Sequence, residues 1–193
     1  MTGLRVGVSL LTHDHRVVEQ ASEFESRGFD VLAVADHLFN WRKPEVPFLD
    51  GWMQLAAIAV ATHTARVTSL VTNLARRTPI QVVKNAIGVD QLSAGRFEVG
   101  VGCGAFPDQR MAGMFEMTIR ERIARLDEGT DVIDRLLKGD TKPFAGRFTR
   151  YGEAHVAPGC VQQPRPPLLV AAAGPRALSI AARVADIWNC SDR

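Results

Sequence analysis

The sequence has few cysteines and little net charge. Its 193 residues include three cysteines without paired spacing, which is typical of a reducing cytoplasm rather than of a disulfide-stabilised secreted domain. The 23 basic and 21 acidic residues leave a net charge of +2, and their mixed order gives no basic stretch of the kind that binds nucleic acid. We therefore expect a cytoplasmic protein whose partner is a small molecule.

Long apolar runs and metal motifs are also missing. The longest apolar segment, near residues 55–61, is too short to cross a bilayer. Arg5 interrupts the region where a signal peptide would need its apolar core. His13 and His15 have a metal-like spacing, but no set of carboxylates or cysteines accompanies them. We expect no membrane span, no signal peptide, no metal site and, since no repeat is present, no solenoid.

What the sequence does contain is a regular alternation of strands and helices. Short runs rich in Val, Leu and Ala have the composition of buried strands, and segments with apolar residues at helical spacing follow them. Pro79 and the capping box Thr118 to Glu121 mark helix starts, and Gly28 marks a helix end. The predicted strands are 4–10, 30–35, 66–72, 96–101, 168–172 and 187–189, and the predicted helices are 14–27, 52–62, 79–92, 119–137 and 174–184.

This alternation predicts an α/β fold. Strands joined by helices form right-handed βαβ units and a parallel sheet, which leaves a doubly wound sheet or a (β/α)8 TIM-type barrel. A complete barrel usually needs about 250 residues. We expect residues 1–193 to form one domain of about six βα units, an incomplete barrel that lacks the last two, with a short hairpin insertion at 144–148 before the fifth strand. Open edges at strands one and six would favour a homodimer.

Polar residues and glycines follow the predicted strands, where the ligands of such sheets bind. His37 could be a general acid or base, because its unperturbed pKa is about 6.5, with Asp36 orienting it. The alternative is that Asp36 caps the backbone and His37 is solvated. Trp41 could form the wall of a pocket for a flat ring, or simply pack.

Two further stretches suggest binding. Residues 100–105 match the pattern G-x-G-x-x-A, but their place on the fourth strand argues against a nicotinamide-binding Rossmann fold. They could let a cofactor lie close to the backbone or form a tight turn, and Cys103 could be a nucleophile or an ordinary buried thiol. The second stretch has the composition of a phosphate-binding helix start and consists of Ala173, Gly174, Pro175 and Arg176. A helix start without any binding role would have the same composition.

In combination, these residues resemble the luciferase-like monooxygenase superfamily, the flavin- and deazaflavin-dependent (β/α) barrel oxidoreductases. The resemblance covers nearly the whole chain. It implies a reduced flavin or deazaflavin across the barrel mouth, with its phosphate chain near Gly174 to Arg176. Residues 69–72 look like the strand that supports the ring, in some members through a non-proline cis peptide. The blocks that carry the resemblance include 28–37, 90–97, 100–102, 144–146, 163–167 and 181–186.

Asp36 and His37 followed by Trp41 are similar to the pattern in members that use the deazaflavin coenzyme F420. The resemblance implies that His37 is the proton donor or acceptor that accompanies hydride transfer to or from a small organic substrate. The sequence departs from some of those enzymes at Ala105, where a glutamate acid often stands. The implied cofactor-binding residues are Asp36, Trp41, Ser69, Leu70, Thr72, Gly102, Cys103, Gly104, Ala173, Gly174, Pro175 and Arg176.

Two alternatives stay open. The first is an FMN-dependent monooxygenase of the same superfamily, which would act with O2 on an alcohol-type or aldehyde-type donor. The second belongs to another class: a non-catalytic flavin-binding protein, or a fragment that is inactive alone.

Overall fold

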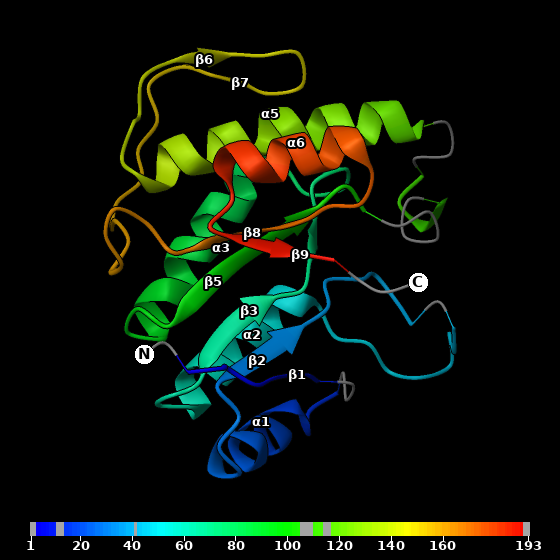
Figure 1. Ribbon diagram of the computed structural model, residues 1–193, viewed down its shortest axis with the longest axis vertical. Coiled ribbons are helices and arrows are strands. Elements are labelled where there is room, and N and C mark those ends of the chain that lie inside the picture. The colour runs from blue at the N-terminus through cyan, green and yellow to red at the C-terminus, as the bar shows by residue number, and fades with distance from the viewer. Residues whose placement is uncertain (1–2, 11–13, 41, 105–109, 114–116, 191–193) are drawn as a thin grey trace.

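The computed structural model describes residues 3–10, 14–40, 42–104, 110–113 and 117–190. Its main feature is one parallel sheet, in which each strand is hydrogen-bonded to the next (Figure 1). A short strand, β4 (Thr72–Asn73), pairs with β5 beyond the end of β3. The other strands, in their order across the sheet, are β1 (Gly7–Ser9), β2 (Val31–Val34), β3 (Arg66–Ser69), β5 (Phe97–Gly102), β8 (Leu168–Ala171) and β9 (Ile187–Asn189).

The strand order decides between the two predicted architectures. In a doubly wound sheet the order reverses at a switch point, whereas the strands of a barrel wall follow chain order. The path β1, β2, β3, β5, β8, β9 follows chain order throughout, and every neighbouring pair is parallel. The prediction of an incomplete TIM-type barrel is therefore confirmed. Among the described strands, β1 and β9 form the edges of this sheet.

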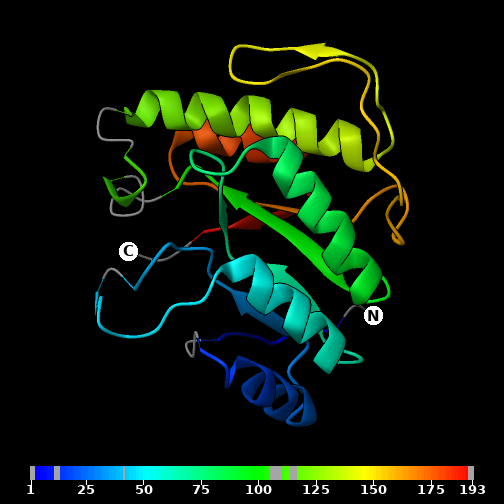
Figure 2. The same cartoon turned by 180° about the vertical axis from the view of Figure 1, so that it is seen from behind.

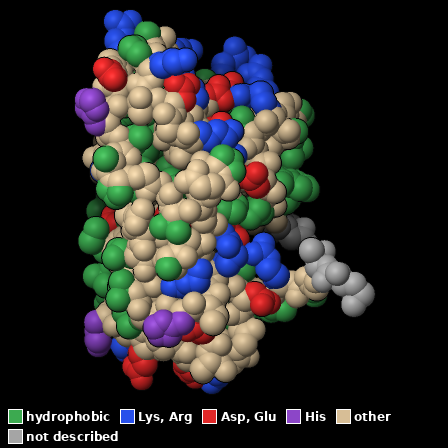
Figure 3. Space-filling view, turned by 90° about the vertical axis from the view of Figure 1, so that its left-hand side faces the viewer, with side chains coloured by type: hydrophobic (Ala, Val, Ile, Leu, Met, Phe, Trp, Pro, Cys, Tyr) green, Lys and Arg blue, Asp and Glu red, His purple; other side chains and the backbone are tan. Residues whose placement is uncertain are grey.

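Within the described residues, five helices form the outer layer. Each one packs against the next along the chain, and Figure 2 shows α2 and α3 in front of the strands in the view from behind. None of the helices within the described ranges is long and apolar enough to cross a membrane. On the face drawn in Figure 3, acidic and basic side chains lie near one another. The helices are α1 (Val17–Ser26), α2 (Gly51–Ala61), α3 (Pro79–Leu92), α5 (Ile119–Leu137) and α6 (Pro175–Val184).

The hydrophobic core lies between the sheet and these helices. Leu32, Val67 and Phe97 lie side by side on β2, β3 and β5, and all three are fully buried. Trp52 of α2 packs on Phe97 with 5.7 Å between the ring centroids. Helix starts follow the sequence signals, since Thr78 and Thr118 each accept a hydrogen bond from a first-turn backbone N–H. The core therefore fixes the strands whose carboxyl ends build the site.

The predicted hairpin insertion is present as β6 (Phe144–Ala145) and β7 (Arg150–Tyr151), which lie over α5 in Figure 1. Glu128 of α5 holds its turn, because the carboxylate accepts hydrogen bonds from three consecutive backbone N–H groups, 147–149, at 2.6 to 2.9 Å. Arg125 lies over the ring of Phe148 at 4.5 Å. The hairpin is therefore held by side chains of α5 and is not part of the main sheet.

Two strands differ from their predicted bounds. The expected strand 4–10 is shortened to β1, and the side chains of Leu4 and Val6 are exposed. The expected strand 66–72 is divided into β3 and β4, with a non-proline cis peptide bond between Leu70 and Val71. Strand β5, by contrast, is buried along its whole length.

Candidate active site

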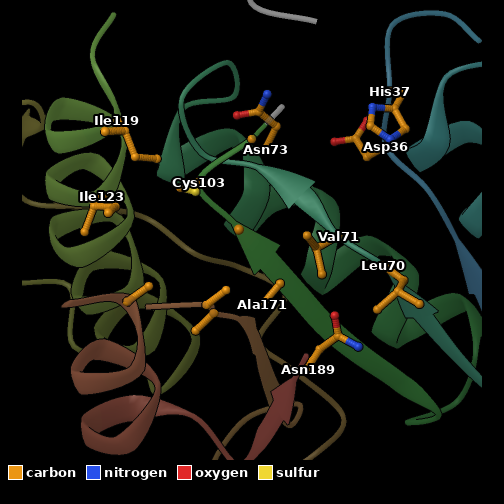
Figure 4. A pocket seen from close by; sticks show the side chains of 15 residues that line it. Asp36, His37, Leu70, Val71, Asn73, Cys103, Ile119, Ile123, Ala171 and Asn189 are labelled. Atoms are coloured by element: carbon orange, nitrogen blue, oxygen red, sulfur yellow. The ribbon is translucent and has the colours of Figure 1, made fainter. Parts of the chain in front are cut away.

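A cavity of about 480 Å³ lies at the carboxyl ends of the strands. Its walls come from the segments that follow β2, β3, β5 and β8, and from the first turns of α5 and α6 (Figure 4). The structure thus brings together segments far apart in the sequence, as the convergence of parallel strands predicts. The sequence-predicted site residues that line the cavity are Asp36, His37, Leu70, Gly102, Cys103, Gly104 and Ala173.

The remaining predicted residues lie elsewhere. Ser69 and Thr72 are fully buried beside the cavity without lining it. Gly174 and Pro175 form the start of α6, and Arg176 lines a separate hollow between α5 and α6. Trp41, together with Ala105, lies outside the described residues. The cofactor-binding roles of all these residues stay predictions.

Asp36 is anchored by two arginines that follow β4. Its carboxylate, which is fully buried, accepts hydrogen bonds from Arg76 Nη2 at 2.9 Å and from Arg77 Nε and Nη2 at 2.7 and 2.8 Å. Arg77 also pairs with Asp50, the residue that caps α2. Burial alone would lower the pKa of Arg77, but its bonds to the two carboxylates outweigh burial and raise that pKa. This cluster ties the end of β2 to the starts of α2 and α3.

His37 follows this anchored aspartate directly and lines the cavity. Its ring lies 6.2 Å from that of Phe48, centroid to centroid, in an edge-on arrangement. An imidazole in the wall of a cavity can serve as a general acid or base. The predicted orienting contact from Asp36 to His37 stays a prediction, whereas the bonds of Asp36 to the arginines are observed.

The glycines of β5 let the segment after β3 approach closely. A Cβ at Gly100 would lie 1.7 Å from the backbone oxygen of Ser69, and a Cβ at Gly102 would lie 2.7 Å from Val71 Cγ2. The Ser69 hydroxyl completes this contact, since it accepts from Gly100 N at 2.8 Å and donates to Gly100 O at 2.9 Å. The close approach at these glycines is thus made by the protein's own chain, and it positions residues 70 and 71 in the cavity wall. The predicted approach of a cofactor to these glycines stays a prediction.

The start of α6 keeps the features of an anion site. Gly174 is the N-cap with φ of 83°, it provides no side-chain cap, and Pro175 occupies the first helical position. First-turn N–H groups without a side-chain acceptor can bind a phosphate. Ala173, the residue just before this turn, lines the cavity, so a group in the cavity could extend to the helix start.

The residues of the cavity fit a flat ring with a polar edge. Leu70, Val71, Ile119 and Ile123 supply apolar surface, while the buried Asn73 carries an amide nitrogen with no hydrogen-bond partner. A mostly apolar pocket with a few fixed polar groups is the usual form of a cofactor site. Among the described residues, no group of three or more His, Cys, Asp or Glu side chains is placed to hold a metal ion.

Several site residues were not identified from the sequence. Arg76 and Arg77 were not identified, because nothing in the sequence indicates which acid they would contact. Asn73 directly follows the predicted strand 66–72 and was given no individual role. Ile119 of α5 and Asn189 of β9 gave no signal, since only the folded sheet brings them to the cavity.

Comparison with known proteins identifies the family of the chain. The family model for luciferase-like monooxygenases matches residues 3–192, and the chain therefore belongs to this family. The F420-dependent hydroxymycolic acid dehydrogenase of Mycobacterium tuberculosis is 29% identical over 193 residues, covering 97% of this chain and 53% of the relative. The F420-dependent glucose-6-phosphate dehydrogenase of Amycolatopsis mediterranei is 32% identical over 181 residues, covering 91% and 53%.

The fold also has solved relatives. An F420-dependent secondary alcohol dehydrogenase, solved with an F420-acetone adduct, superposes with a TM-score of 0.86 at 23% identity. The match covers 96% of this chain and 57% of that chain. The chain thus spans about half the length of the relatives it matches.

Proposed function

We propose that this chain is an F420-dependent oxidoreductase that acts on a small organic substrate at the cavity. The proposal is supported chiefly by one observation: seven of the residues predicted for a deazaflavin site, from four separate segments, line the same cavity. The F420 dependence of the curated relatives supports the choice of cofactor. When bound, the deazaflavin ring supplies the position that gives or takes the hydride.

The chain's own residues would have three tasks. Leu70 and Val71 would contact one face of the ring. Together with Ile123 they would exclude water from it. The free N–H groups at the start of α6 would bind the phosphate. His37 would take the proton from a substrate hydroxyl as hydride leaves, or return it in the reverse direction, at an imidazole nitrogen.

Separate titrations with F420 and FMN test the cofactor. Quenching of F420 fluorescence by the purified chain is the expected result, with little affinity for FMN. Tight FMN binding without F420 affinity would instead favour the monooxygenase alternative. Binding of neither cofactor would refute the proposal for this chain.

The role of His37 is tested by His37→Ala. If the imidazole moves the proton, turnover should fall by about 10²- to 10⁴-fold while the dissociation constant for F420 changes little. His155→Ala is a matched control, because that side chain is exposed and lies outside the cavity. Equal loss of turnover and of F420 affinity in His37→Ala would mean that His37 binds the cofactor rather than transferring a proton.

A homodimer and a cytoplasmic location also remain proposals. Edge strands offer unpaired backbone groups to a second copy, and β1 and β9 are the edges of the described sheet. The cysteines are free thiols, which suits a reducing compartment. Light scattering of the purified chain would report a dimer mass or contradict the dimer.

A further inference from the structure

Asn73 is the last residue of β4, and its side chain is held inside the protein at the cavity wall. It is 2% exposed and lines the cavity together with His37 and Cys103. In the view of Figure 4 it lies between Cys103 and the pair Asp36 and His37. Its position at the end of the segment that supplies the cavity floor makes it a fixed part of the site.

The amide of Asn73 is oriented by one hydrogen bond and by close packing. Its oxygen, Oδ1, accepts a hydrogen bond from the backbone N–H of Ala75 at 2.9 Å. Gly104 packs against the same amide so closely that a Cβ there would lie 2.1 Å from Oδ1, and its φ of +80° also favours glycine. Arg122 holds the Gly104 carbonyl at 2.8 Å. Gly104 therefore packs against the whole amide, since the same Cβ would lie 2.3 Å from Nδ2.

The amide nitrogen, Nδ2, is buried without an acceptor. Buried donors are nearly always paired in folded proteins, and an unpaired one costs stability. Among the described residues that carry such a buried, unpartnered side-chain atom, Asn73 is the only one that lines the cavity. A ligand in the cavity is therefore the natural partner of this N–H group.

We infer that Asn73 Nδ2 donates a hydrogen bond to a ring carbonyl oxygen of the coenzyme in the cavity. The inference rests on the proposed function and adds a binding residue and an orientation to it. Deazaflavins and flavins share a pyrimidinedione edge whose carbonyls accept hydrogen bonds. With this bond, the pyrimidinedione edge would lie at the end of the cavity that Asn73, Cys103 and Gly104 form. The opposite edge of the ring would then lie toward Asn189.

Two variants test this contact without removing the turn. In Asn73→Asp one carboxyl oxygen can still accept from Ala75 N–H, but the donor becomes an acceptor that faces the ring carbonyl. In Asn73→Ser the hydroxyl can keep a weaker version of the turn bond and no amide remains. Tyr151→Phe is the matched control, because it removes another buried unpartnered polar atom, outside the cavity.

The probe is F420 itself, followed by fluorescence quenching, with infrared difference spectra of the bound coenzyme as a second readout. We expect the dissociation constant to rise about tenfold or more in both Asn73 variants, which is about 1.4 kcal/mol, and to stay unchanged in Tyr151→Phe. The carbonyl stretch of bound F420 should shift to higher frequency when its donor is lost. Thermal unfolding curves show which variants are folded. If Asn73→Asp does not fold, the contact is tested by Asn73→Ser alone.

The outcomes separate the two proposals. If the wild-type chain binds neither F420 nor FMN, the proposed function fails and the inference fails with it. If the wild type binds F420 and the folded Asn73 variants bind it equally well, the inference alone is overturned. Weaker binding with an unchanged carbonyl frequency would also overturn it, since Asn73 would then act only through the local structure.

Discussion

Neutralising Asp36 should destabilise the protein strongly. The substitution Asp36→Asn leaves Arg76 and Arg77 facing a neutral amide in a place where their side chains are only 10% and 16% exposed. Breaking a buried, hydrogen-bonded ion pair typically costs about 3–5 kcal/mol, because the remaining charge is desolvated and uncompensated. For a chain of this size that loss lowers the melting temperature by roughly 6–20 °C.

The assay is urea unfolding of wild type and variant, with Asp140→Asn as the matched control. Asp140 also pairs with an arginine, Arg135, but these side chains are 31% and 40% exposed, so a much smaller loss of stability is expected. Asp36→Asn combined with Arg76→Gln should recover part of the loss, since both members of that pair are then neutral and Arg77 keeps its pairing with Asp50. A loss for Asp36→Asn no larger than for Asp140→Asn would refute the role of Asp36 as a buried anchor.

Two stability predictions follow from other parts of the fold. The first concerns Glu25. Burial alone would raise the pKa of its carboxyl group, but hydrogen bonds from the backbone N–H groups of residues 63–65 outweigh burial and lower that pKa from 4.5 to about 2. Its contribution, about 2 kcal/mol after allowance for partial exposure, is therefore complete above pH 4.5 and lost as the pH falls toward 2. Glu25→Ala should lose this stability at pH 7 and flatten that part of the pH profile; an unchanged profile contradicts the pairing. Gly100→Ala should prevent soluble folding, because its Cβ would lie 1.7 Å from Ser69 O, whereas Gly88→Ala meets nothing within 4 Å and should be tolerated. Circular dichroism of Gly100→Ala and Gly88→Ala tests this prediction. A normally folded Gly100→Ala would contradict the close contact.

Much of the fold could be predicted because local signals and global topology agree. The helix starts at Pro79 and Thr118 lie where the sequence places them, and the apolar runs before Asp36 and around Val99 are the strands β2 and β5. Chain order across the sheet could not be read from the sequence, since doubly wound and barrel sheets share the same alternation.

The site was predictable to the extent that it follows strand ends. His37, Gly102 and Cys103 directly follow or end buried strands, so their convergence follows from a parallel sheet. The partners of Asp36 could not be predicted, because Arg76 and Arg77 are 40 and 41 residues away and only tertiary structure brings them together. The division of the expected strand 66–72 into β3 and β4 could not be derived from its composition, and only the resemblance to the family suggested an unusual peptide bond within 69–72.

The most direct test of this account is a crystal structure of the chain with F420. We expect the deazaflavin ring in the 480 Å³ cavity, against Leu70 and Val71, with a ring carbonyl at Asn73 Nδ2 and His37 beside the reactive carbon. A ring bound at another surface, or at this cavity with His37 and Asn73 both remote from it, would contradict the central claim.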